Sequence, residues 1–221
     1  MKIKFLFLVF ILSSSISLWA LEHENNLETL EKKVKVERQI LNSKSLAIKQ
    51  QLALMVDLDQ EIRDLIIKDV NNRKTHKLLE EIDHFHTNHL KSMVKEYDWV
   101  TILKFDEEMA HQAWLLVQHA DHDPDFQTSF MSALEKLCPL NETYRKNYAY
   151  IYDRIASNRG LKQRYGTQVK VEGNQVELLP YEGSLNDLNK RRREIGLESI
   201  QEYLKTLKKY YVKSEIVPAC S

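Results

Sequence analysis

Glycine and proline are scarce in this chain, which has five Gly and four Pro among 221 residues. All-β sandwiches and barrels need many turns, so this scarcity disfavours them and favours helices. The sequence also lacks a glycine-rich phosphate loop, a dinucleotide fingerprint and a Gly-x-Ser-x-Gly elbow, which removes the usual signatures of nucleotide sites and of a nucleophilic triad. We therefore expect a mainly α protein, a multi-helix single domain with one small β-hairpin.

A net charge is lacking as well, because 32 Lys and Arg balance 32 Asp and Glu. Proteins that bind nucleic acid normally carry a basic patch or excess, so this balance gives no reason to expect nucleic acid as a partner. The hydrophobic content of 43% is enough for one apolar core in a chain of this length.

Cysteine is limited to Cys138 and Cys220. In an oxidising compartment the two thiols can form a disulfide that ties the C-terminal tail to the middle of the chain. The sequence does not give the distance between their Cα atoms, so the bonded and the free alternatives both stay open.

The first twenty residues differ from the rest. A basic start (residues 1–4) precedes an apolar run (residues 5–12) and a stretch rich in small residues (residues 13–20). This order is typical of a secretory signal peptide, with cleavage after Ser17 or Ala20. The apolar run is shorter than the roughly 20 residues that a spanning helix needs, so we expect export to the periplasm or the medium and no stable membrane span after signal removal.

The rest of the chain divides into an amphipathic N-terminal helix or spacer (21–50), a helical domain (51–211) and a C-terminal tail (212–221). Residues 24–69 read as one long helix or two consecutive ones, with Asn26 as an N-cap. Leu27, Leu30, Val34 and Leu41 form one apolar stripe on the first of these, which fits a coiled-coil-like lead, a helix that docks a partner or a partly ordered spacer.

Further helices are predicted from periodicity and from capping residues. Asp123 followed by Pro124 starts one helix and ends its predecessor. Gly160 ends another, and Ser199 with Glu202 has capping-box spacing. A hairpin is expected around Gly173-Asn174. The predicted helices are 71–97, 105–122, 124–137, 144–158, 185–195 and 199–211, and the predicted strands are 167–172 and 175–179.

Five short segments resemble a family of bacterial domains of unknown function. That family carries Asp-Gln-x-x-Arg, Gly-Trp-Pro, Val-Gln-His-Ala-Asp, Tyr-Leu-x-Asp-Arg and Gln-x-Tyr-Gly-Thr-Gln in this order. The resemblance covers roughly residues 51–210 and implies no established activity, but it groups the polar residues. Asp98 and Val100 depart from the Gly and Pro of the second motif. The matching segments are 59–63 (DQEIR), 98–101 (DWVT), 113–121 (AWLLVQHAD), 148–154 (YAYIYDR) and 163–168 (QRYGTQ).

These motifs supply the candidate site, provided that the fold brings them together. His119 is a candidate general acid or base because imidazole titrates near neutral pH, and Asp121 can orient it if the helix ends there. Arginine would hold an anionic group, and amides or a phenol would give directional hydrogen bonds. Hydrolysis of a small polar or anionic ligand is the simplest reaction. The candidate ligand-binding residues are Asp59, Arg63, Gln118, Asp153, Arg154, Gln163, Tyr165 and Gln168.

Two alternatives remain beside this pocket. In the first, the same residues form a structural polar network, with Asp59 paired to Arg63 and with Asp153 and Arg154 bracing the loop of residues 160–167, in a non-catalytic interaction module that docks through its N-terminal helix. In the second, histidines hold a metal, either His111 with His119 and His122 or His119 with Asp121 and Asp123.

No HExxH or paired-cysteine spacing supports the metal alternative, so we assign no metal ligand and name no cofactor. His84, His86 and His89 lie close in sequence but do not converge on one helical face. We expect these three imidazoles to be solvated.

Overall fold

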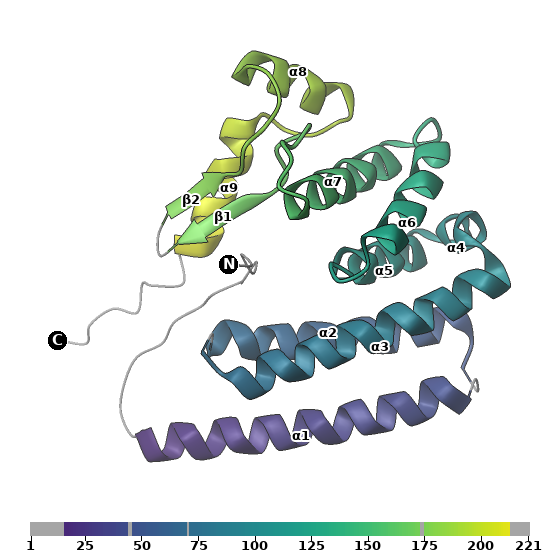
Figure 1. Cartoon of the computed structure of the whole chain (residues 1–221), viewed down its shortest axis with the longest axis vertical. Helices are drawn as coiled ribbons and strands as arrows, with labels where there is room; N and C mark the ends of the chain where they lie inside the picture. The colour runs from purple at the N-terminus through teal and green to yellow at the C-terminus, as the bar shows by residue number, and fades with distance from the viewer. Residues whose placement is uncertain (1–15, 44–45, 70, 173–174, 213–221) are drawn as a thin grey trace.

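The computed structural model describes residues 16–43, 46–69, 71–172 and 175–212 (Figure 1). Nine helices and one two-stranded antiparallel sheet occur within these ranges, and about three-quarters of the described residues are helical. The predicted fold class is therefore confirmed. The elements are α1 (Ile16–Ser43), α2 (Ile48–Lys68), α3 (Arg73–Tyr97), α4 (Trp99–Phe105), α5 (Glu107–Gln118), α6 (Pro124–Leu137), α7 (Glu142–Asn158), β1 (Val169–Glu172), β2 (Gln175–Leu178), α8 (Leu185–Glu194) and α9 (Ile200–Val212).

The helices form layers that are stacked along the long axis of the molecule (Figure 1). The long helices α1, α2 and α3 pack on one another at one end, and α5 lies across α2. Helices α6 and α7 pack against each other above α5, and the hairpin with α8 and α9 lies at the far end. The predicted polar residues of α2, α5 and α7 therefore come from successive layers.

The largest apolar core joins α2 through α7. Phe130, Ile102 and Leu116 are buried in it, and the Trp99 ring meets Phe130 edge-on at 4.8 Å. Trp99 also donates from its indole N–H to the Ser129 hydroxyl at 3.2 Å, which satisfies the ring's polar atom. This core fixes α5, and with it the helix end that carries His119.

A second apolar core lies between α1, α2 and α3. The stripe of Leu27, Leu30 and Val34 packs there against Leu58 and Ile62. Fully burying one such side chain contributes about 1.5–3 kcal/mol relative to exposure. The stripe, for which docking to a partner was one alternative, is thus buried within its own chain.

Most of the predicted helix limits hold, and two do not. The helix expected at 105–122 is shorter, because Asp106 accepts the Met109 N–H at 2.7 Å and caps α5, which then ends at Gln118; the short helix α4 before it was not predicted. Asn26 is not an N-cap, since α1 begins ten residues earlier at Ile16. The Asp123-Pro124 start of α6 is confirmed, with Asp123 Oδ1 accepting the Phe126 N–H at 3.0 Å.

The predicted turns and caps near the C-terminal end also hold. Gly160 follows α7 with φ 71°, a left-handed conformation that favours glycine. Ser199 and Glu202 form the capping box of α9. In the hairpin, Val169 pairs with Leu178 and both flanking strands lie within the predicted ranges, while the Gly173-Asn174 turn lies outside the described residues.

One histidine prediction is wrong. His86 is buried, and its Nε2 lies 2.9 Å from Glu37 Oε1 of α1. The error arose because the partner is 49 positions away in sequence, on a helix whose docking the local pattern does not show. His84 is exposed and His89 is half-buried beside Gln51.

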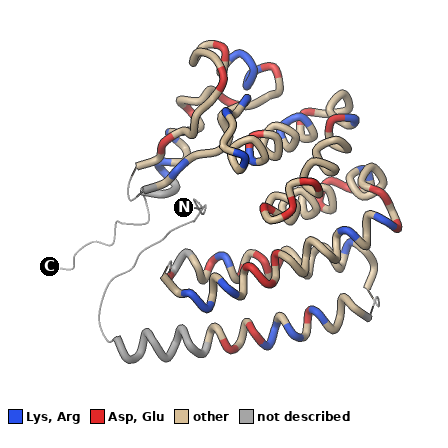
Figure 2. The backbone as a smooth tube through the Cα atoms, in the orientation of Figure 1, with Lys and Arg blue, Asp and Glu red and all other residues tan. Residues whose placement is uncertain are grey.

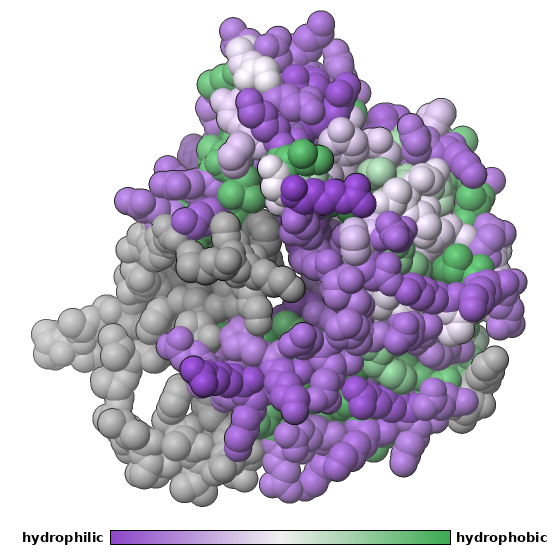
Figure 3. Space-filling model, in the orientation of Figure 1, coloured by the Kyte–Doolittle hydropathy of each residue, from purple (hydrophilic) through white to green (hydrophobic). Residues whose placement is uncertain are grey.

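Charges of both signs are interspersed along α1, α2 and α3 (Figure 2), and the face shown in Figure 3 is mainly hydrophilic. Within the described ranges, no helix combines the length and the apolar character that a membrane crossing needs. Most of the predicted signal segment, residues 1–15, and Cys220 lie outside those ranges, whereas Cys138 is half-buried.

Candidate functional site

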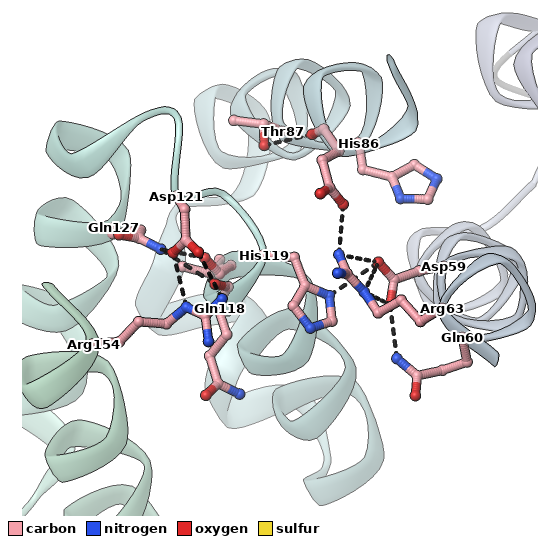
Figure 4. A network of polar contacts seen from close by, with 12 residues as sticks. Asp59, Gln60, Arg63, His86, Thr87, Gln118, His119, Asp121, Gln127 and Arg154 are labelled. Carbon is pink, nitrogen blue, oxygen red and sulfur yellow. Dashed lines mark hydrogen bonds and ion pairs between the residues drawn. The ribbon is translucent and has the colours of Figure 1, made fainter. Parts of the chain in front are cut away.

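The structure places eight of the ten predicted site residues in two polar clusters, and Gln118 and Tyr165 lie outside both. The first, here called the His119 cluster, consists of Asp59, Arg63, Asp83, His119, Asp121 and Arg154. The second, the Asp153 cluster, consists of Asp153, Gln163, Thr167 and Gln168. Figure 4 shows the first, with the His119 ring between the Asp59–Arg63 pair and the Asp121–Arg154 pair. Gln118 precedes His119 and is buried at the end of α5.

Asp59 is the buried centre of the His119 cluster. Its carboxylate has no exposed surface, and it accepts only from side chains. Arg63, one helical turn along α2, donates from Nε at 3.0 Å, as the i,i+4 spacing predicted. Gln60 Nε2 donates at 2.7 Å and the His119 Nδ1 lies 2.9 Å from Oδ1. The carboxylate is therefore fully coordinated by groups from α2 and from the end of α5.

Arg63 bridges two carboxylates. Besides Asp59, its Nη2 donates to Asp83 Oδ1 of α3 at 2.7 Å. Asp83 belongs to this site, yet none of the sequence motifs contains it. It follows buried Ile82 on an amphipathic helix, a position that the sequence alone assigns to the polar face.

His119 is held at the end of α5. The helix stops at Gln118, and His119 is its C-cap, with its own N–H donating to Leu116 O at 3.1 Å. We expected Asp121 to orient the imidazole once the helix ended there. That prediction is wrong, because Asp59 takes this role and Asp121 turns toward α7.

Asp121 is bound by three side chains from two helices. Arg154 donates to it in a bidentate pair, from Nε at 2.8 Å and from Nη2 at 2.7 Å (Figure 4). Asn158 and Gln127 complete the set at 2.8 and 3.0 Å. Arg154 thus faces away from the loop that we expected it to brace, because on α7 it points to a different face from its neighbour Asp153.

The cluster shifts the protonation of its members. Burial alone would raise the pKa of Asp59, but the neighbouring His119 and Arg63 outweigh it, so the pKa lies well below its ordinary range. Burial lowers the pKa of His119, against the pull of Asp59. Burial raises the pKa of Asp83 to about 7, against the pull of Arg63. At neutral pH an ionised Asp59 therefore accepts from a neutral imidazole, which leaves Nε2 with its lone pair.

The Asp153 cluster has a different construction. Asp153 on α7 is fully buried, and its carboxylate accepts the backbone N–H groups of Arg164, Tyr165 and Thr167 at 2.8 to 3.1 Å. The Thr167 hydroxyl adds a further bond at 3.0 Å. This confirms that Asp153 braces the loop of residues 160–167.

Gln163 and Gln168 complete that loop rather than facing a ligand. Gln163 Oε1 accepts the Gln168 N–H at 2.7 Å, and its amide nitrogen donates to the backbone oxygens of Gln168 and Leu179. Gln168 is itself buried and donates to the Thr167 hydroxyl at 3.1 Å. Their amides are used within the loop, so the ligand-binding role that we predicted for them has no support from the geometry.

One set of groups has metal-ligand spacing. Among the described residues, one ligand atom from each of Asp59, Asp83 and His119 lies within 4.8 Å of the others. The Arg63 guanidinium already bridges the two carboxylates, however, and neutralises them in the way a cation would. His111 and His122 belong to no such group in the described part of the chain.

A mainly α domain with two polar clusters, to which α7 contributes Arg154 and Asp153 respectively, is thus the class that the fold and the geometry define. The chain belongs to a family of unknown function, DUF6624, whose model matches residues 46–214. This confirms the expected family resemblance, and the matched range contains both clusters but not α1. No curated protein and no solved structure matches the chain.

Proposed function

We propose that the His119 cluster is an acid–base site that binds a small polar substrate and hydrolyses it. The observation that carries this proposal is the 2.9 Å contact between His119 Nδ1 and the buried Asp59 carboxylate. A carboxylate on one ring nitrogen fixes the tautomer and the orientation of an imidazole, so that the other nitrogen can take a proton. The side chain of His119 is 15% exposed, which gives a water molecule or a substrate hydroxyl access to the ring.

Asp83 supplies the second half of the chemistry. A carboxyl group with a pKa near 7 is partly protonated at neutral pH and can donate a proton to a leaving group. It lies in the same group of atoms within 4.8 Å as His119. The pKa of Asp83 is raised and that of His119 is lowered, and neighbouring groups with shifted pKa values are typical of catalytic sites.

The charges of the cluster favour a neutral polar substrate over an anionic one. Arg63 is bridged between Asp59 and Asp83, and Arg154 is bound bidentate to Asp121. An incoming anion would have to displace a carboxylate from one of these guanidinium groups. The Asp121 side chain is 40% exposed and can accept hydrogen bonds from substrate hydroxyl or amide groups.

The test is a panel of chromogenic esters, phosphoesters, glycosides and amides, assayed from about pH 5 to 9. We expect turnover of one class, and a loss of about 100-fold or more in His119→Gln, the usual contribution of a general base. His111→Gln is the matched control because His111 is exposed on the same helix. Full activity in a folded His119→Gln variant, or no turnover across the panel, would refute the proposal.

A structural network is the second candidate. The carboxylates of Asp59 and Asp121 are bonded through both oxygens within the chain and tie α2 to the end of α5 and the end of α5 to α6 and α7. The bond from Arg63 to Asp83 adds α3. Such a network needs no ligand. On this account His119→Gln lowers the unfolding midpoint by several degrees while no substrate is turned over. A partner-docking role for α1 has less support, since its apolar stripe is buried.

We further propose that the protein is exported. The support is the basic start, the apolar run and the small-residue exit of residues 1–20. Expression of the full chain in a bacterial host, followed by cell fractionation and intact mass, tests this directly. A mature species in the periplasm or medium that lacks 17 or 20 residues is expected. A full-length cytoplasmic product would count against export.

A further inference from the structure

A surface hollow of about 410 Å³ lies where α6 and α7 meet the loop that Asp153 braces. Its walls include Tyr148 and Tyr152 of α7 and Arg164 and Tyr165 of the loop. Small-molecule sites usually span about 300–1,000 Å³, so the hollow is large enough for a small ligand. The proposed hydrolysis does not use it.

Three tyrosine rings give the hollow an aromatic wall. Tyr148 and Tyr152 are one helical turn apart, with ring centres 6.0 Å from each other. The Tyr165 ring meets Tyr152 edge-on, also at 6.0 Å. Burial raises the pKa of Tyr148 to about 12, so its phenol stays neutral and can donate a hydrogen bond. A flat ring can stack on such a surface without displacing any ion pair.

Two guanidinium groups stand beside this wall. The Arg164 guanidinium lies 5.9 Å from the centre of the Tyr165 ring, and its nearest carboxylate, on half-exposed Glu182, is 3.9 Å away. Arg145 donates from Nη1 to Cys138 O at 3.1 Å. Glu135 is the carboxylate in the lining, so the lining carries two positive groups and one negative group. Planar guanidinium groups bind carboxylates and phosphates with directional hydrogen bonds.

The loop side of the hollow is rigid before any ligand arrives. Asp153 accepts the N–H groups of Arg164 and Tyr165, while Arg191 and Arg192 donate to the backbone oxygens of the same two residues at 2.6 and 2.8 Å. All four backbone polar groups are thus satisfied, and only the two side chains remain to contact a ligand. A preformed site costs less ordering entropy on binding.

We propose that this hollow binds a small planar anion, an aromatic ring that bears a carboxylate or a phosphate group. The ring lies against Tyr148, Tyr152 and Tyr165, and the anionic group contacts Arg164 and Arg145. The site is separate from the His119 cluster, since Tyr152 and Arg154 are two positions apart on α7 and so lie about 200° apart around an ideal helix.

Binding of benzoate and of phenyl phosphate to the full chain, measured by calorimetry, tests the proposal. Phenol and inorganic phosphate are the single-feature probes, and each is expected to bind at least tenfold more weakly than the ring that carries the anion. The affinities of benzoate and phenyl phosphate, compared with each other, separate a carboxylate site from a phosphate site. The proposal would be overturned if neither benzoate nor phenyl phosphate saturated the protein, or if inorganic phosphate bound as tightly as phenyl phosphate.

Variants locate the binding in the hollow. Arg164→Gln keeps the backbone bond to Asp153 and is expected to weaken binding at least tenfold, and Arg164→Lys to restore part of it. Tyr152→Leu is expected to weaken binding about fivefold or more. Lys162→Gln is the matched control, exposed on the same loop. His119→Gln should bind normally, which separates this site from the hydrolytic one. Unchanged affinity in folded Arg164→Gln and Tyr152→Leu would place the ligand elsewhere.

Discussion

Asp59 and Asp153 are both fully buried, yet different kinds of hydrogen-bond donor stabilise their carboxylates. Asp153 accepts from three backbone amides and one hydroxyl, none of which can gain or lose a proton near neutral pH. Asp59 accepts from an arginine, an imidazole and an amide side chain. The first arrangement fixes a loop, while the second couples a carboxylate to groups that titrate or move.

This contrast separates a scaffold from a site with chemical capacity. Backbone donors are held by the fold, so Asp153 can be removed only with the loss of the loop geometry. Side-chain donors can turn to other partners, as Arg63 can turn fully to Asp83. The two carboxylates therefore provide a matched pair of substitutions whose effects should differ in size and in pH dependence.

Asp153→Asn should have the largest effect on stability. One amide oxygen cannot serve the amides of Arg164, Tyr165 and Thr167, and the new N–H₂ group faces other donors. We expect a loss of about 3–4 kcal/mol in the free energy of unfolding, measured by urea denaturation at pH 7. Exposed Asp64→Asn on α2 is the control and should change it by less than about 0.5 kcal/mol. A loss below about 1 kcal/mol would mean that the backbone donors around Asp153 do not make it essential to the loop.

Asp59→Asn should cost less, about 2–3 kcal/mol at pH 7, because Arg63 keeps its bond to Asp83. In the parent, the pKa of Asp59 is lowered in the folded state. The Asp59 carboxylate therefore contributes its full stabilisation above the ordinary Asp pKa near 4 and loses it as the pH falls further. The difference between parent and variant, followed by urea denaturation, should therefore shrink on acidification below about pH 4. A constant difference down to pH 2 would contradict the lowered pKa.

Asp83→Asn should have a smaller effect with the opposite pH trend. With a pKa of about 7 when folded and near 4 when unfolded, Asp83 binds a proton more tightly in the folded chain. Its contribution is thus present at pH 4 and is lost as the pH rises to about 7. The free energy of unfolding of the variant, measured relative to the parent by urea denaturation, should therefore rise by about 1–2 kcal/mol between pH 5 and pH 8. A flat difference over that range would show that Asp83 is fully ionised.

The smallest effect concerns the imidazole. Burial lowers the pKa of His119 and Asp59 opposes this, so in Asp59→Asn the pKa should fall further. The Cε1 proton of His119, followed by NMR from pH 4 to 8, measures the midpoint in both proteins. The His111 signal from the same helix provides the internal reference. A midpoint that rises in Asp59→Asn would mean that the carboxylate does not act on the ring.

Local pattern was sufficient wherever partners are close in sequence. Asp123 and Pro124 start α6, Ser199 and Glu202 cap α9, and Asp59 pairs with Arg63 one turn away, all as predicted. These interactions depend on backbone geometry and on spacings of three or four residues, which any helix imposes. The family motifs added the bracing of residues 160–167 by Asp153, eleven to fourteen positions apart.

The errors concern partners that only packing brings together. His86 was predicted to be solvated because its local surroundings are polar, yet Glu37 approaches it from α1. Asp121 was expected to orient His119 if the helix ended there. The helix does end there, yet Arg154, 33 positions away, holds Asp121. The pattern within one helix cannot predict either contact, because in each case the partner lies on another helix.

The amino-acid sequence by itself determined the mainly helical class, the caps and the hairpin, because propensity and spacing act within a few residues. The family resemblance grouped the polar residues. The tertiary structure decided how that set divides between the His119 cluster and the Asp153 cluster. It also added Asp83 and buried the stripe of α1. Those outcomes depend on which helix faces pack against each other, and the cost of burying a charge then selects its partner.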